Sequence, residues 1–169
     1  MVKEELIRRL KEVGALKFGE FVLSSGQRSN VYIDIKHACT YPDVLKLITE
    51  LMAERVKNVD FDKIACIELG GVPLAVALSL RLNKPLVIFR KQKKDYGIED
   101  DCIGVIEPGE RFVVVEDVTT TGRSALSVVE RVEKRGGIVK AILSVVNRGA
   151  EIQNLISILT LDELISESS

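Results

Sequence analysis

Four short apolar runs constrain the fold more than any other feature of this chain. They span residues 63–69, 85–91, 111–117 and 138–148, and helix-like segments separate most of them. Runs of this length and apolarity are typical of strands buried on both faces of a sheet. Strands that alternate with helices form βαβ units, in which neighbouring strands run parallel. We therefore expect an α/β fold with an open, mostly parallel sheet and helices on both of its faces.

The flanking segments predict helices and one hairpin. Apolar residues at helical spacing over residues 6–13 predict a helix that stops at Gly14. Two extended stretches, residues 20–23 and 31–36, are joined by a polar turn and predict a small β-hairpin. Further helices are expected at residues 42–58, 70–83 and 122–137, and the tail is expected to hold a strand and a short helix. We expect a single domain over residues 1–169, with about 1–40 forming a hood and 41–169 the core.

The composition favours no charged partner. The chain has 169 residues, of which 46% are hydrophobic, enough for one sizeable core. Lys and Arg number 24 against 25 Asp and Glu, so no net charge attracts nucleic acid or a membrane surface. The chain lacks a membrane-spanning run and a signal peptide. Cys39, Cys66 and Cys102 are spaced for neither disulfides nor zinc. We expect a cytoplasmic protein.

The third apolar run ends on two acids, Glu116 and Asp117, and continues as VTTTGRS. Ligands of open parallel sheets bind beyond the carboxyl ends of the strands. The N–H groups that open the following helix attract an anion such as a phosphate. The acids, with pKa values of about 4, would both be ionised at neutral pH and accept hydrogen bonds from sugar hydroxyls. Adjacent strand side chains face opposite ways, which disfavours joint chelation of one metal ion. An ordinary strand end with a helix cap explains the composition equally well.

The order of these residues resembles the 5-phosphoribosyl-1-diphosphate (PRPP) motif of the type I phosphoribosyltransferases. The resemblance implies that family's fold, and Mg²⁺ as a cofactor held mainly by PRPP with no direct protein ligand. It also implies PRPP contacts from Glu116, Asp117, Val118, Thr119, Thr120, Thr121, Gly122, Arg123 and Ser124.

Four other segments resemble the orotate phosphoribosyltransferases, in particular their compact archaeal members. They are FGEFVLSSGQRSNVYIDIK (18–36), GGVPLA (70–75), FRKQKKDYG (89–97) and SVVNRGA (144–150). The resemblance implies transfer of ribose 5-phosphate from PRPP to orotate, which yields orotidine 5′-monophosphate and pyrophosphate in pyrimidine biosynthesis. It further implies a homodimer in which each catalytic loop acts in the partner's site. Substrates, and neither nucleic acid nor a membrane, are the expected partners.

The cation-rich segment after the second apolar run supplies the expected catalytic groups. By resemblance, Arg90, Lys91 and Lys94 contact PRPP and act in catalysis together with Asp117. Cations there would stabilise the charge that develops on the leaving pyrophosphate. Taken alone, such a run is more often a solvated face. Residues 96–111 are polar and contain glycine and proline, so we expect a closing lid.

Two glycines and one arginine complete the expected site. Gly70 and Gly71 would contact pyrophosphate through backbone N–H groups, although a plain strand-to-helix turn explains them equally well. Arg148 can bind the orotate carboxylate bidentately, with Thr120 beside it by resemblance. For the residue alone, a surface pair with Glu151 is the simpler interpretation.

The chain also departs from many bacterial relatives. Ser24 and Gly70 stand where those enzymes have lysine, Tyr96 where they have histidine, and Asn147 where they have aspartate. Two cationic substrate contacts are therefore missing, which affects the expected affinity. Two other functions stay open at this point: a phosphoribosyltransferase for a purine base, and a PRPP-sensing regulatory protein.

Overall fold

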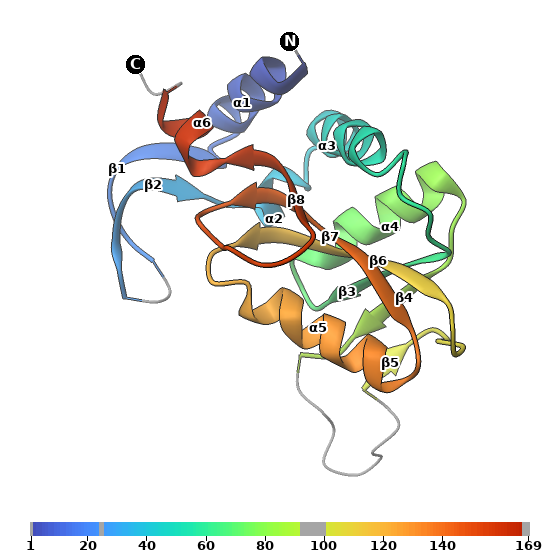
Figure 1. The fold of residues 1–169 in the computed structure, drawn as a ribbon. Helices are drawn as coiled ribbons and strands as arrows, with labels where there is room; N and C mark the ends of the chain where they lie inside the picture. Colours follow the sequence, from blue (N-terminus) through green and yellow to red (C-terminus); the bar gives the residue numbers. More distant parts are fainter. Residues whose placement is uncertain (1, 24–25, 92–100, 167–169) are drawn as a thin grey trace.

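The computed structural model describes residues 2–23, 26–91 and 101–166. Its strands are β1 (Leu16–Val22), β2 (Arg28–Ile33), β3 (Lys63–Ile67), β4 (Leu86–Phe89), β5 (Cys102–Ile103), β6 (Arg111–Thr119), β7 (Ile138–Asn147) and β8 (Leu155–Thr160). Its helices are α1 (Val2–Glu12), α2 (Ile35–Ala38), α3 (Pro42–Arg55), α4 (Gly71–Leu82), α5 (Arg123–Lys134) and α6 (Leu161–Ser166). A six-stranded sheet forms the centre, and β1 and β2 form a separate antiparallel hairpin (Figure 1).

The sheet order creates a binding crevice. The order is β5-β4-β3-β6-β7-β8, with every pair parallel except β4 and β5. The chain moves outward from β3 to β4 on one side, and later starts again at β6 on the other side of β3. The segments that leave β3 and β6 therefore diverge, and ligands of open α/β sheets bind at such a point.

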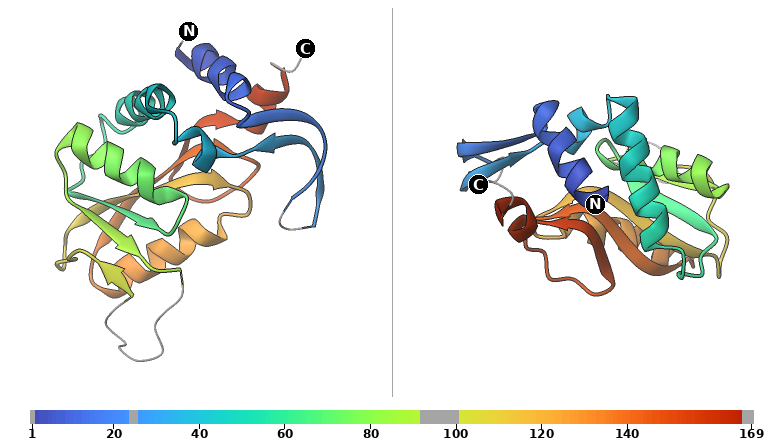
Figure 2. Two further views of the ribbon diagram at one scale, coloured as in Figure 1. Left: turned by 180° about the vertical axis from the view of Figure 1, so that it is seen from behind. Right: turned by 90° about the horizontal axis from the view of Figure 1, so that it is seen from above.

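Side chains of β6 alternate between two apolar cores. Val113 and Val115 join the core beneath α1, α3 and α4, whereas Phe112 and Val114 join the core beneath α5. Figure 2 shows α3 and α4 over one face of the sheet and α5 over the other. These layers confirm the predicted α/β architecture with helices on both faces. By the same alternation, Glu116 follows the row that faces α5 and Asp117 the row that faces α4.

The hairpin differs from its predicted extent. The second extended stretch ends at Ile33 rather than at residue 36, because Asp34 caps a short helix: its Oδ1 accepts a hydrogen bond from the His37 N–H at 3.1 Å. A side-chain cap of this kind satisfies one free donor of a first turn. Lys36 therefore belongs to α2, between the hairpin and the sheet.

Other element boundaries also differ from the predicted ones. The strand expected at 111–117 continues to Thr119, because it pairs with β7 as far as Asn147. The helix expected at 42–58 ends at Arg55. Within the predicted lid at 96–111, residues 102 and 103 form an antiparallel edge strand beside β4. The extent of β6 and the presence of β5 depend on pairing partners distant in sequence, which periodicity does not reveal.

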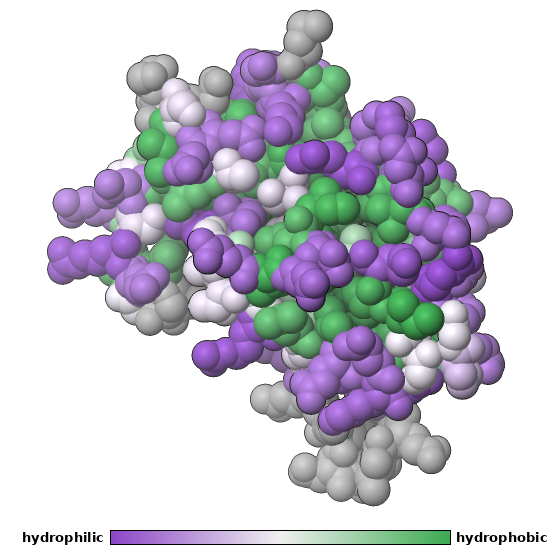
Figure 3. All heavy atoms as spheres, viewed as in Figure 1, coloured by the Kyte–Doolittle hydropathy of each residue, from purple (hydrophilic) through white to green (hydrophobic). Residues whose placement is uncertain are grey.

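The surface is largely polar. On the face seen in Figure 1, hydrophilic residues surround a smaller apolar area (Figure 3). Within the ranges that the structure describes, no helix has both the length and the apolarity needed to cross a membrane.

Candidate functional site

The carboxylate of Asp117 lies against the backbone of Gly70, where the ends of β6 and β3 meet. A Cβ atom at Gly70 would overlap this carboxylate, and even its Oδ1 atom would be only 2.7 Å away. A Cβ atom at Gly71 would lie 2.8 Å from the carbonyl oxygen of Val115. Such distances are well inside normal contact, so both glycines allow the loop after β3 to pack on β6. The two predicted segments, GGVPLA and the acid pair, are thus adjacent in space.

Lys36 is a functional candidate that the sequence analysis missed. Its Nζ lies 3.7 Å from Oδ2 of Asp117, across the gap between α2 and β6. The lysine side chain is 54% exposed and the aspartate side chain 15% exposed. An exposed pair of this kind contributes little to stability, so the lysine is available to a ligand. The only sequence signal was one lysine at the end of a predicted strand.

Glu116 is not the ionised acid that the sequence suggested. It is 6% exposed, and burial, with the nearby charge of Asp117, raises its pKa to about 7. Lys36 opposes this rise. Desolvation disfavours the charged form of a buried carboxylic acid, so at neutral pH a large share of Glu116 carries a proton. This corrects the expectation that Glu116 is fully ionised at neutral pH.

The Thr119 hydroxyl forms hydrogen bonds within the protein core and does not point into the exposed loop. Thr119 is buried, and its hydroxyl lies 3.1 Å from both Ser144 Oγ and Asn147 Oδ1. Its carbonyl oxygen accepts a hydrogen bond from the Arg148 N–H at 2.7 Å. A substrate contact through the Thr119 hydroxyl would break this network. Its predicted role toward PRPP remains untested.

The exposed part of the predicted phosphate loop begins at Thr120. Gly122 has φ +87° as the N-cap of α5 and makes no side-chain cap, and a Cβ there would lie 2.9 Å from Ile152. The first turn of a helix has N–H groups without intrahelical partners, and here a glycine cap supplies no oxygen to them. Thr121 Oγ1 accepts one bond, from the Arg123 N–H at 3.3 Å. Beside the loop is a surface hollow of about 450 Å³, lined by Thr121, Arg123, Leu126, Ser127 and Glu130.

Arg148 connects the core to the hairpin. Its Nη2 donates to Ser29 Oγ at 2.8 Å and to the Val31 carbonyl oxygen at 3.0 Å. Partial burial lowers its pKa from the ordinary arginine value, yet an arginine stays charged. The expected alternative partner was Glu151, but the observed partners belong to β2. Asn147 shapes the turn that follows, because its Oδ1 accepts from the N–H groups of Gly149 and Ala150.

Arg90 and Lys91 lie at the end of β4, close to the end of β3. The Lys91 N–H donates to Glu68 Oε2 at 3.1 Å. Of the side-chain nitrogen and oxygen atoms buried in the described ranges, only Arg90 Nε has no hydrogen-bond partner. An unpaired buried donor is costly, so a bound anion fits this position. Lys93, Lys94, Tyr96 and Ser24 lie outside the described residues.

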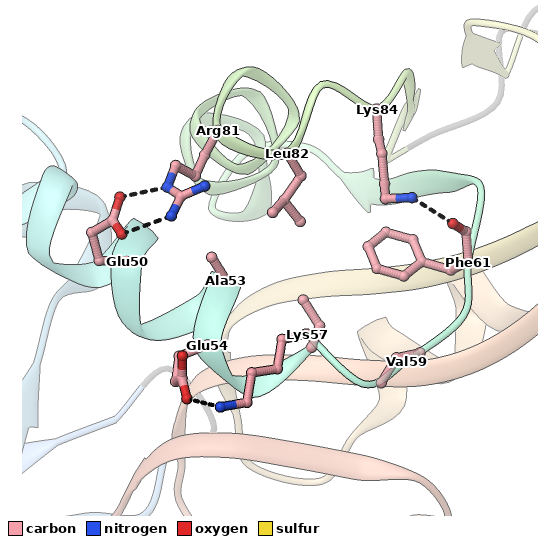
Figure 4. Close-up of a pocket in the computed structure, with 10 residues that line it drawn as sticks. Glu50, Ala53, Glu54, Lys57, Val59, Phe61, Arg81, Leu82 and Lys84 are labelled. Atoms are coloured by element: carbon pink, nitrogen blue, oxygen red, sulfur yellow. Dashed lines mark hydrogen bonds and ion pairs between the residues drawn. The ribbon is translucent and has the colours of Figure 1, made fainter.

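A hollow of about 420 Å³ lies at the opposite, amino edge of the sheet, between α3 and α4 (Figure 4). Its charged residues are already paired. Arg81 Nε lies 2.7 Å from Glu50 Oε1, and Lys84 Nζ donates to the Phe61 carbonyl oxygen at 2.7 Å. We assign this hollow no function, because its charged side chains already have partners within the protein and it is remote from the ends of β3 and β6.

Comparison with known proteins agrees with this geometry. The family model described as phosphoribosyl transferase domain matches residues 40–167. The chain is 59% identical over 165 residues to the orotate phosphoribosyltransferase of Archaeoglobus fulgidus, covering 98% of this chain and 93% of the relative. The chain belongs to the orotate phosphoribosyltransferase family. The resemblance inferred from the sequence is thereby confirmed, together with the fold and the class of enzyme.

Solved structures of this family are also similar. The crystal structure of orotate phosphoribosyltransferase from Aeropyrum pernix has a TM-score of 0.86 and 33% identity, covering 96% of this chain and 97% of that one. The Mycobacterium tuberculosis orotate phosphoribosyltransferase in complex with PRPP has a TM-score of 0.77 and 28% identity, covering 97% and 99%. The individual site residues predicted for this family member remain predictions.

Proposed function

We propose that this family member binds PRPP across the carboxyl edge of β3 and β6 and transfers its ribose 5-phosphate to orotate. The contact between Gly70 and Asp117 carries the proposal, because it joins the expected pyrophosphate loop to the expected ribose-binding acid. The products would be orotidine 5′-monophosphate and pyrophosphate. We further propose that about residues 1–40 act as a hood on the core within one cytoplasmic domain.

The donor would lie along β6 and the start of α5. The 5-phosphate would bind the N–H groups and hydroxyls of residues 120–124, where helix geometry favours an anion. Asp117 would accept hydrogen bonds from the ribose hydroxyls. Glu116, partly protonated at neutral pH, would either donate or accept one. Gly70 and Gly71 would allow the pyrophosphate to approach the backbone closely, since neither has a side chain.

Mg²⁺ would come with PRPP. Among the described residues, no group of three or more His, Cys, Asp and Glu side chains is arranged to hold a metal ion. Asp117 offers a partly exposed carboxylate at the site. With so few donors from the protein, the cation would be held mainly by PRPP. When bound, Mg²⁺ would neutralise charge on the diphosphate.

The acceptor would bind between the hood and the core. Arg148 is held by two contacts through one nitrogen, Nη2, which leaves its other donors free of partners among the described residues. A guanidinium fixed in this way could bind the orotate carboxylate through two hydrogen bonds. We propose Thr120 as a second orotate contact. It is exposed and directly follows β6, the strand next to the one that Arg148 follows.

The reaction would be a displacement at C1 of the ribose with oxocarbenium character. Orotate would attack through a ring nitrogen that is already deprotonated or readily loses its proton to solvent, so the chain needs no general base. Charge develops on the leaving pyrophosphate, and Arg90, Lys91 and Lys94 would stabilise it in a site with little water. Asp117 would hold the ribose and lie near the developing positive charge.

The chain would act as a homodimer, with Lys94 reaching the partner's site. Exposed apolar residues on the outer side of α4 and on the loop before it offer a surface for a second copy: Leu69 is 69% exposed, Val76 40% and Leu80 81%. Apolar residues gathered on one helix face often mark an interface. Sedimentation of Leu80→Glu against wild-type protein would show whether this face holds the dimer together.

A substrate panel tests the proposed function. Purified protein with Mg²⁺ and PRPP would be offered orotate, uracil, adenine, hypoxanthine and xanthine, and release of pyrophosphate would be measured. We expect turnover with orotate. Turnover with a purine but not with orotate would overturn the assignment, and PRPP binding without any turnover would favour a regulatory protein.

A further inference from the structure

Arg90 is held through its backbone at the point where β4 ends. Its N–H donates to the Asp101 carbonyl oxygen at 2.7 Å, and its own carbonyl oxygen accepts from Arg131 Nη1 at 2.7 Å. The following N–H, of Lys91, donates to Glu68. The backbone here is therefore tied to the segment before β5, to α5 and to the end of β3.

Asp101 connects the residues that hold Arg90. It is 3% exposed and forms an ion pair with Arg135, and Arg131 Nε lies 4.0 Å from its Oδ2. Arg135 Nη1 also donates to the Arg131 carbonyl oxygen at 3.0 Å. A buried carboxylate with two guanidinium partners is costly to disturb, because removing a partner leaves a buried charge. We call Asp101, Arg131 and Arg135 the stem clamp.

The stem clamp is also packed against the strand that leads to Arg90. The guanidinium carbons of Arg131 and Arg135 lie 5.5 Å and 5.4 Å from the centre of the Phe89 ring. Phe89 is fully buried and precedes Arg90 directly. Stacking of this kind restricts both arginines and the ring. The position of Arg90 thus depends on Arg131 of α5 and on Arg135, the residue that caps the end of α5, and neither has a place in the catalytic scheme.

The charges around Arg90 leave it short of an acceptor. The buried carboxylate of Asp101 pairs with the guanidinium groups of Arg131 and Arg135. Arg90 Nε is buried without a partner. Because the clamp occupies Asp101, that carboxylate does not neutralise the Arg90 side chain, which keeps its charge available to an anion.

We propose that Asp101, Arg131 and Arg135 are positioning residues that hold Arg90 toward the pyrophosphate of PRPP. They contact no substrate and act through the backbone of Arg90. The inference rests on the proposed function, in which Arg90 binds the leaving pyrophosphate. A misplacement of about 1 Å at a reacting group can cost on the order of a hundred-fold in rate, so the clamp has a measurable effect.

The test is a double-mutant cycle on Arg90 and Arg131. Arg131→Met keeps the stem length and removes the donors, while Asp101 keeps its pair with Arg135. Arg131→Lys keeps the charge and serves as the milder variant if the methionine variant does not fold. Lys134→Gln is the control, because Lys134 lies on the same helix, is 68% exposed and pairs only with Glu130 across one turn. The readouts are Kd for inorganic pyrophosphate by calorimetry, kcat and KM for PRPP and for orotate, and Tm.

We expect Arg131→Met to weaken pyrophosphate binding and raise KM for PRPP about ten-fold, with KM for orotate changed less than two-fold. Arg131→Lys should weaken pyrophosphate binding less than Arg131→Met does. Lys134→Gln should have the pyrophosphate Kd and the KM for PRPP of the wild type. In an Arg90→Met background, Arg131→Met should add less than a two-fold change, since coupled residues are not additive. An equal fold-change in both backgrounds, or equal changes for PRPP and orotate, would overturn the clamp. If the wild type binds pyrophosphate but does not convert orotate, the proposed function fails while the cycle still tests the clamp by binding.

Discussion

Asp117 fills the space that a side chain at Gly70 would need. The carboxylate of one strand end thus lies directly on the backbone of the next, with Oδ1 only 2.7 Å from where a Cβ of residue 70 would be. Gly70 itself has φ −59° and ψ −33°, which any residue adopts without strain. The glycine is therefore required for space and not for backbone conformation.

We expect Gly70→Ala to displace Asp117 and to raise KM for PRPP by about ten-fold, with a loss of about 1–2 kcal/mol in the free energy of unfolding. Steady-state kinetics and denaturant unfolding measure the two effects. The double variant with Asp117→Ala isolates the cause: if the clash acts through Asp117, adding Gly70→Ala to Asp117→Ala changes little. If Gly70→Ala raises KM for PRPP as much in the Asp117→Ala background as in the wild type, the explanation is contradicted.

Lys36 should matter for the substrate and little for the fold. Its pair with Asp117 is half-exposed, so Lys36→Met is expected to change the free energy of unfolding by less than about 1 kcal/mol. Because Lys36 pairs with Asp117, the proposed ribose-binding acid, KM for PRPP should rise several-fold. Lys57→Met is a matched control, since Lys57 is 58% exposed and also pairs with one acid. Equal KM values for the two variants would remove Lys36 from the site.

Glu116 should make stability depend on pH. Its folded pKa of about 7 lies above the ordinary value of 4.5, so between these pH values the folded chain holds a proton that the unfolded chain has lost. The unfolding free energy therefore falls as pH rises from about 4.5 through about 7, by about 2–3 kcal/mol. Glu116→Gln lacks this titrating group. The difference between its free energy of unfolding and that of the wild type should therefore shift in favour of the variant between pH 5 and pH 8. Parallel stability curves for the two proteins would contradict the raised pKa.

Arg148→Ala should raise KM for orotate at least ten-fold while KM for PRPP changes much less, because a bidentate carboxylate contact is lost. The substitution also removes the contacts to Ser29 and Val31, so a control is needed. Ser29→Ala removes one of these contacts and keeps the guanidinium. We expect that variant to retain most orotate affinity. Kinetics with each substrate varied in turn distinguish loss of the guanidinium from loss of its contact to the hairpin. Equal effects of Arg148→Ala on the KM values for orotate and PRPP would argue against the carboxylate contact.

Much of this protein could be predicted from its sequence because the relevant signals are local. The apolar runs of β3, β4, β6 and β7 and the helical spacing of α3 and α5 are encoded in neighbouring residues, and they imply a parallel sheet. The order of Glu116, Asp117 and the TTTG loop identified the family for the same reason. A strand end and the loop after it are one continuous segment, so their chemistry can be read without knowing the fold.

The tertiary structure decided what depends on residues distant in the chain. Ser29 and Arg148 are 119 residues apart and meet only because the hairpin folds onto the strand ends. The approach of Lys36 to Asp117, and the pairing of the buried Asp101 with Arg131 and Arg135 at the end of α5, have no periodic signal. The pKa of Glu116 likewise depends on desolvation, which packing creates. The sequence by itself determined the elements, the sheet and the PRPP motif, whereas packing decided which charges meet and which of them are buried.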